Sequence, residues 1–127
     1  MEIRSGPTVF EQVGGTPWFV NLIDRFYDAI ETDPVVRPMY PEDLTESRSH
    51  MVGFLQQFWG GPTDYSDNRG HPRLRMRHAP FVIGETERNA WLGHMLDAVR
   101  SGDLSPELEQ QMVDYFERAS THMINAD

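Results

Sequence analysis

Apolar residues recur at intervals of three and four along most of this chain, and glycine, proline or a capping hydroxyl stands at most of the points where the pattern stops. Residues with that spacing share one face of an α-helix, and the interrupting residues are typical of helix ends. No segment between two interruptions alternates apolar and polar residues over the length of a strand. The sequence therefore predicts an all-α fold.

Five helices are expected, and their ends carry recognisable signals. Thr8 and Glu11 form a capping-box pattern at the start of the first helix. Thr16 is placed to cap the second helix, with Pro17 at its first helical position. The expected helices cover about residues 8–14, 16–33, 45–59, 84–99 and 105–123. The third helix is expected to carry on one side Ser47, Met51, Phe54, Leu55 and Phe58.

Length and composition exclude several classes of protein. A chain of 127 residues is expected to form one compact domain, residues 1–127, with a short tail over about residues 1–7. Its net charge of −9 argues against binding to nucleic-acid phosphates, and none of its apolar runs approaches the length of a membrane span. Without cysteine it has no disulfide, thiolate ligand, cysteine nucleophile or thioether-bound haem. The first residues lack the pattern of a secretory signal, so a cytoplasmic location is expected.

The stretch between the third and fourth helices is the exception to the helical pattern. It covers residues 62–83 with little periodicity, and loops of that length inside a compact domain are usually functional. It places Arg73, Arg75 and Arg77 directly before His78, in a chain that is otherwise strongly acidic. A lone histidine usually has an ordinary surface or hydrogen-bonding explanation, which suits His122. His94 could flank the core, and His50, at the margin of the apolar side of its helix, is ambiguous.

His78 is the histidine with the most suggestive surroundings, because it has cations beside it, apolar neighbours and a helix-breaking proline at Pro80. A zinc site would need three or four ligands at metal spacing, which this segment does not supply. A haem iron needs one axial imidazole, an apolar slot and cations for the propionates, all of which the segment supplies. A cofactor-free helical interaction domain, with the arginines on a solvated or partner-binding face, is the alternative at this point.

Three aromatic residues with polar tips, Tyr27, Tyr40 and Trp91, are expected near the inward sides of the helices or just after them. Core packing is the common use of aromatic residues at such positions. Each of the three also carries an O–H or N–H group that needs a partner when buried, and a polar diatomic ligand on a haem iron would accept hydrogen bonds from them. They are therefore candidates for the opposite side of a haem pocket.

Several blocks of residues are spread over nearly the whole chain, from about Phe10 to Asn125. They are Phe26-Tyr27, Arg37-Pro38-Met39-Tyr40-Pro41-Glu42-Asp43-Leu44, Gln57-Phe58-Trp59-Gly60-Gly61-Pro62, Tyr65-Ser66, the run from Gly70 to Phe81, and Ala90-Trp91-Leu92. Together they resemble the truncated haemoglobins, above all the second group, often called the O type. The resemblance implies a two-over-two helical sandwich, a shortened globin in which a loop replaces most of the helix that carries the proximal histidine.

The resemblance also implies a role for each matching residue. His78 would be the proximal ligand to the iron of a non-covalent haem b. The ligand on the other side of the haem would be surrounded by Tyr27, Tyr40, Ser47, Met51 and Trp91. The haem plane would contact Phe54, Leu55, Leu74, Met76 and Phe81, and the propionates would face Arg73 or Arg77, with Tyr65 and His71. Since Ser47 matches the place of the distal histidine of ordinary globins, this pocket is expected to lack one.

The expected function is that of a cytoplasmic haem protein that binds O2, CO, NO or similar small ligands at ferrous iron. Hydrogen bonds from tyrosine and tryptophan to the bound ligand would slow its release. Peroxidase or nitric oxide dioxygenase activity is the alternative, because polar donors around a haem also assist those reactions. An unidentified reductase and a second copy of the chain in a homodimer are the expected macromolecular partners, and nucleic acid is not.

Overall fold

The computed structural model describes residues 7–63 and 82–125. Within these two ranges the prediction of an all-α fold is confirmed, since they form helices and connecting turns and contain no strand. The helices are α1 (Val9–Val13), α2 (Thr16–Glu31), the 3-10 helix η1 (Arg37–Met39), α3 (Thr45–Phe58), α6 (Glu85–Arg100) and α7 (Pro106–His122). None of these described helices is long and apolar enough to cross a membrane.

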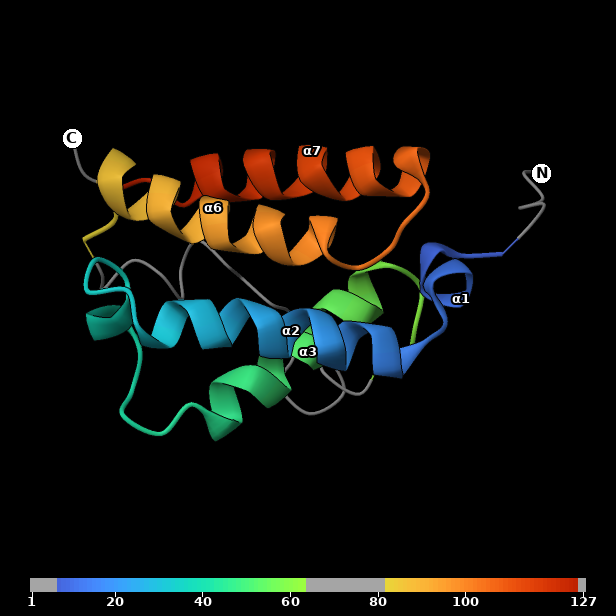
Figure 1. The fold of residues 1–127 in the computed structure, drawn as a ribbon, viewed down its shortest axis with the longest axis horizontal. Helices are drawn as coiled ribbons and strands as arrows, with labels where there is room; N and C mark the ends of the chain where they lie inside the picture. Colours follow the sequence, from blue (N-terminus) through green and yellow to red (C-terminus); the bar gives the residue numbers. More distant parts are fainter. Residues whose placement is uncertain (1–6, 64–81, 126–127) are drawn as a thin grey trace.

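Two pairs of long helices are stacked on each other (Figure 1). α6 and α7 lie side by side and run in opposite directions, while α2 packs against both α3 and α6. α2 is therefore the helix through which the two pairs are joined. The two-over-two sandwich that the resemblance implies is confirmed.

Side-chain caps fix where the first and the last helix begin. The Glu11 amide donates to the Thr8 hydroxyl at 3.1 Å, and the Thr8 amide donates to the Glu11 carboxylate at 2.8 Å, which confirms the predicted capping box. The Leu108 amide donates to the Ser105 hydroxyl at 3.3 Å at the start of α7. Gly14 ends α1 in the left-handed region, with a φ of 103°, as glycine does at many helix ends.

The start of α2 differs from the prediction. Gly15 and not Thr16 is the N-cap residue, and Thr16 already lies inside the helix with Pro17. The Thr16 hydroxyl instead donates to the Gln56 side-chain oxygen on α3 at 2.8 Å. Glycine adopts the φ of 82° that the turn from α1 into α2 requires, so the chain turns at Gly15 and Thr16 joins α2 to α3.

The core lies where the two helix pairs meet, and α2 contributes more of it than any other described helix. The residues of α2 that have no exposed surface are Phe19, Leu22, Ile23, Phe26 and Ile30. α6 adds Met95 and Val99, and α7 adds Met112 and Phe116. Each such side chain stabilises the fold by about 1.5–3 kcal/mol through burial. The core therefore fixes the position of α2 and of the side chains near its C-terminal end.

The apolar side of α3 is only partly covered. Leu55 is 1% exposed, whereas Phe58 is 52% exposed, and Ser47, Met51 and Phe54 are half-buried. The Phe58 ring packs against Tyr115 of α7, with 4.3 Å between ring centroids. Because α3 crosses α2 at an angle (Figure 1), only part of its length is buried against the other helices.

The C-terminal end of α3 packs closely against α1. The Phe10 amide donates to the Trp59 carbonyl oxygen at 2.9 Å. Gly60 has a φ of 94°, and a Cβ atom there would lie 2.7 Å from Cβ of Thr8, while one at Gly61 would lie 2.5 Å from the Phe10 ring. These two positions therefore need glycine, which explains the Gly-Gly pair after α3.

Candidate functional site

Three polar-tipped aromatic side chains from three different elements meet in one place. Tyr27 lies near the end of α2, Tyr40 directly follows η1, and Trp91 lies on α6. Nε1 of Trp91 donates to the Tyr40 hydroxyl oxygen at 3.0 Å, and the rings of Tyr27 and Tyr40 meet edge to face at 5.5 Å. The Phe26 ring lies between Tyr27 and Trp91, at 5.0 Å and 5.2 Å from their centroids. We call Tyr27, Tyr40 and Trp91 the donor cluster.

Arg37 holds the backbone around Tyr40. Its guanidinium donates to the carbonyl oxygens of Tyr40, Pro41 and Glu42 at 3.3, 2.9 and 2.9 Å. The Tyr40 amide in turn donates to the Arg37 carbonyl oxygen at 3.1 Å. The Arg37 side chain therefore holds three successive carbonyl groups of the turn between η1 and α3, and the Tyr40 ring lies against Trp91.

Both tyrosines of the donor cluster stay protonated at neutral pH. Burial raises the pKa of Tyr40 to about 12, against the lowering effects of its hydrogen bonds with Trp91 and Tyr27. Burial raises the pKa of Tyr27 far above its usual value of 10, Tyr40 raises it further, and the charge of Arg48 acts in the opposite direction. Since the Tyr40 oxygen accepts a hydrogen bond from the indole N–H of Trp91, Tyr40 can use its own hydroxyl proton to donate elsewhere.

The residues of α3 that the sequence assigns to the site differ in how deeply they are buried. The Ser47 carbonyl oxygen lies 3.5 Å from the Tyr27 hydroxyl, at the long limit of a hydrogen bond. Met51 and Phe54 follow Ser47 at helical spacing and pack partly buried against the core. Leu55 belongs to the core itself. The partly covered side of α3 therefore adjoins the donor cluster through Ser47, and Leu55 is the most deeply buried of these residues.

Arg48 is a residue of this site that the sequence analysis missed. Its guanidinium lies 5.4 Å from the centroid of the Tyr27 ring. The same group pairs with Asp24 at 3.1 Å and Asp28 at 3.3 Å, and lies 3.8 Å from Glu31. These carboxylates recur along α2 at intervals of four and three, so they share one helix face. The acidic row is visible in the sequence, but the arginine reaches it only through the packing of α3 on α2.

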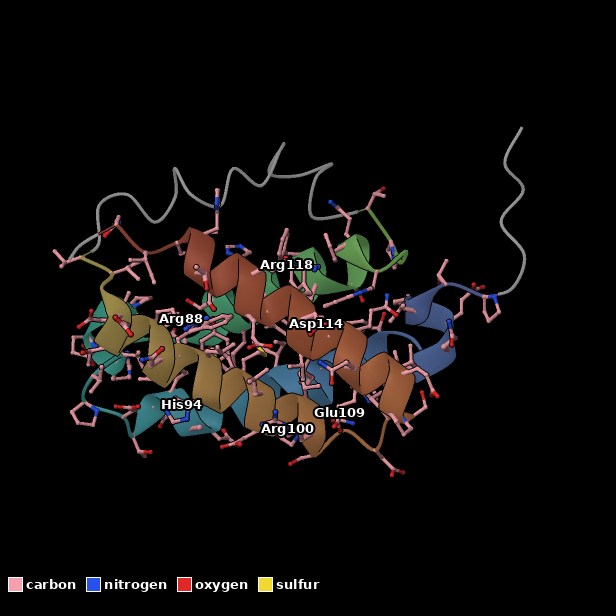
Figure 2. The ribbon with its side chains drawn as sticks, turned by 90° about the horizontal axis from the view of Figure 1, so that it is seen from above. Arg88, His94, Arg100, Glu109, Asp114 and Arg118 are labelled. Atoms are coloured by element: carbon pink, nitrogen blue, oxygen red, sulfur yellow. The ribbon has the colours of Figure 1, made fainter. Side chains whose placement is uncertain are left out.

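His94 has a defined partner on the segment that follows α2. Its Nε2 lies 2.6 Å from Oδ2 of Asp33, and the two side chains are 25% and 19% exposed. The hydrogen bond with His94, and then that from the Val35 amide, hold the pKa of Asp33 below its ordinary value. Figure 2 shows His94 on the side of α6 away from α7, whereas Arg88 lies on the α7 side.

The residues expected on the other side of a haem lie outside the described ranges. They are Tyr65, His71, Arg73, Leu74, Met76, Arg77, His78 and Phe81. Their roles stay predictions from the sequence. The described residues supply the donor cluster and the partly covered side of α3.

Known proteins match this chain over most of its length. A family model described as bacterial-like globin matches residues 8–125. The group 2 truncated hemoglobin YjbI of Bacillus subtilis is 38% identical over 104 residues, which make up 82% of this chain and 79% of that protein. The structure of a thermostable hemoglobin from the actinobacterium Thermobifida fusca matches with a TM-score of 0.91 at 49% identity, over 94% of this chain and 98% of that one. A truncated oxygen-avid haemoglobin from Bacillus subtilis matches with a TM-score of 0.88 at 35% identity, over 94% of this chain and 100% of that one.

Proposed function

The chain belongs to the bacterial-like globin family, with a group 2 truncated haemoglobin among its relatives, and on this basis we propose that it is a haem protein that binds O2 and other small ligands and releases them slowly. The family match over residues 8–125 carries the assignment of haem and gaseous ligand. Slow release is supported by the donor cluster and by the similarity to a haemoglobin described as oxygen-avid.

The described residues fit one side of a haem. A haem pocket needs an apolar wall beside donors that reach the bound ligand. Met51 and Phe54 on the partly covered side of α3 provide apolar surface, and the contact between Tyr27 and Ser47 brings that surface next to the donor cluster. The donors themselves are neutral O–H and N–H groups, which suit a ligand that carries partial negative charge.

A ferrous haem supplies an iron that takes up one diatomic ligand reversibly. The chain supplies the hydrogen bonds to that ligand. Accepting a hydrogen bond from Trp91 polarises the Tyr40 hydroxyl and leaves its own proton available to the ligand. The Tyr27 hydroxyl has partners within the chain, the Ser47 carbonyl oxygen at 3.5 Å and the Tyr40 hydroxyl, so it donates to a ligand only by giving up one of these weak contacts. One hydrogen bond to a charged partner is worth about 1.5–3 kcal/mol, and two would slow release by roughly a hundredfold or more.

The axial ligand in this proposal is His78, and its basis is the resemblance of the sequence around it to the family. An imidazole is the proximal ligand that globins use, and basic side chains pair with propionates. In this proposal, the propionates are bound by Arg73 or Arg77, together with Tyr65 and His71.

The proposal is tested by the absorption spectrum of the purified full-length chain with hemin. Wild type is expected to bind one haem per chain and to show a five-coordinate ferrous spectrum, which His78→Ala loses and added imidazole restores. His122→Ala, at the exposed end of α7, is the matched control and should keep the wild-type spectrum. If the wild-type chain binds no hemin, the proposed function is overturned. If His78→Ala keeps the wild-type spectrum, the assignment of His78 as the axial ligand is overturned.

A further inference from the structure

Two hydrogen bonds tie α6 to the segment that follows α2. One joins Nε1 of Trp91 to the Tyr40 hydroxyl at 3.0 Å, and the other joins Nε2 of His94 to Oδ2 of Asp33 at 2.6 Å. Residues three apart in a helix lie on neighbouring turns of the same face. The two bonds therefore join the same pair of elements, one helical turn apart on α6.

The backbone between Asp33 and Tyr40 links these two bonds. The Arg37 amide donates to the Asp33 carbonyl oxygen at 2.9 Å, and the Tyr40 amide donates to the Arg37 carbonyl oxygen at 3.1 Å. A closed ring of contacts results, which runs through Asp33, Arg37, Tyr40, Trp91 and His94 and back to Asp33. Loss of the hydrogen bond between Asp33 and His94 is therefore expected to change the geometry of the hydrogen bond between Trp91 and Tyr40.

The Asp33 carboxylate is well placed to hold its side of the ring. Oδ2 bonds to His94, while Oδ1 accepts from the Val35 amide at 2.8 Å, so both oxygens are fixed. The Asp33 and His94 side chains are 19% and 25% exposed, whereas each carboxylate around Arg48 is more than half exposed. Shielding from solvent strengthens a hydrogen bond to a charged group. The pair is therefore a stronger link than an ordinary surface ion pair.

We infer that Asp33 and His94 are positioning residues that hold Trp91 against Tyr40. They fix the spacing between α6 and the segment that carries Tyr40, and so determine how the Tyr40 hydroxyl is presented to a ligand. The effect on ligand release rests on the proposed function. The effect on the Trp91–Tyr40 hydrogen bond does not, because that bond lies within the chain itself.

Substitutions at His94 separate the hydrogen bond from the rest of the side chain. His94→Leu removes the bond to Asp33, while His94→Gln keeps an N–H donor in its place. Asp33→Asn is the second disrupting variant, since it keeps an acceptor for the Val35 amide and removes the charged acceptor for His94. Arg25→Gln is the control, because it breaks another link between α2 and α6, from Arg25 to the Ala98 carbonyl oxygen, two turns beyond Trp91.

The direct readout is the exchange rate of the Trp91 indole proton, measured by NMR and assigned by its loss in Trp91→Phe. We expect roughly threefold to tenfold faster exchange in His94→Leu and Asp33→Asn, and a rate near that of wild type in His94→Gln and Arg25→Gln. In the haem-loaded protein, the two disrupting variants should also release ligand faster, by a similar factor.

An unchanged indole exchange rate in both disrupting variants overturns the inference. The same acceleration in Arg25→Gln as in His94→Leu also overturns it, because it would indicate general loosening of α6. If the chain binds no haem, the exchange rates are still measurable, so failure of the proposed function is distinguished from failure of the positioning role.

Discussion

Substituting Tyr40→Phe and Trp91→Phe, singly and together, shows whether Trp91 reaches a ligand directly or acts through Tyr40. In the structure, the indole N–H of Trp91 donates to the Tyr40 hydroxyl at 3.0 Å, which leaves the hydroxyl proton of Tyr40 to donate to another acceptor. This order of donors predicts that Tyr40 donates to the ligand. Trp91 then strengthens that hydrogen bond indirectly, by polarising the Tyr40 hydroxyl.

The two arrangements predict different accelerations of ligand release when a donor is removed. Loss of the Tyr40 hydrogen bond to a ligand with partial charge should cost about 1.5–3 kcal/mol, which accelerates release roughly tenfold to 150-fold. Polarisation by a second donor adds about 10–30% to such a bond, so Trp91→Phe alone should accelerate release at most about fivefold. In the Tyr40→Phe background, Trp91→Phe should then have no further effect.

The assay is stopped-flow displacement of O2 by CO from the haem-loaded ferrous protein, analysed as a double-mutant cycle. Tyr115→Phe is the matched control, because burial also raises the pKa of this tyrosine to about 12, yet its ring packs with Trp59 and Phe58 away from the donor cluster. Its release rate should equal that of wild type. If Trp91→Phe alone accelerates O2 release more than tenfold, and this factor multiplies with that of Tyr40→Phe, Trp91 does not act through Tyr40 and the reasoning is refuted.

Three further predictions concern stability. Arg48→Gln should lower the free energy of unfolding, measured in urea, by about 1–2 kcal/mol, because it removes two exposed ion pairs and one cation–π contact. The loss should be smaller at high salt, which screens the ion pairs. Gly60→Ala should destabilise the protein by more than about 1 kcal/mol, because Gly60 has a φ of 94° and its added Cβ would collide with Thr8. Gly93→Ala, on the open face of α6, should instead stabilise it by up to about 1 kcal/mol. Equal changes in unfolding free energy for the two variants would contradict this reasoning. Because the pKa of Asp33 is lowered by folding, its charge stabilises the fold above the ordinary pKa and loses that effect as the pH falls through the folded-state pKa. Asp33→Asn should therefore lower the unfolding free energy at neutral pH and make little difference in strong acid, and a difference that persists in acid would count against this.

The sequence predicts those parts of the fold that local chemistry decides. The helix ends at Thr8, Gly14 and Ser105 follow from hydroxyl caps and glycine conformations within a few residues. Where two local signals compete, as at Gly15 and Thr16, the outcome depended on a tertiary contact, the hydrogen bond of Thr16 to α3. The partial exposure of Phe58 likewise depends on the angle at which α3 crosses α2, which apolar spacing does not encode.

The candidate site was predictable to the extent that it resembles a family. Their polar tips made Tyr27, Tyr40 and Trp91 candidates, the resemblance assigned them to the ligand side of a haem, and the structure brings them together. The partners that hold them in place were not predictable, because Arg48 and His94 reach Asp24, Asp28 and Asp33 across helices, at sequence separations of 20 to 61 residues. Such pairs appear only once the helices are packed.

If the proposed ligand site lies beside Tyr40, the hydrogen bonds from Arg37 to three consecutive carbonyl oxygens have a kinetic consequence for ligand binding. The conformational entropy of this turn is lost when the chain folds, so none of it remains to be lost when a small molecule arrives. Ligand binding would then be preorganised on this side of the proposed site. The association rate should follow the width of the entry route, with little dependence on rearrangement of the turn.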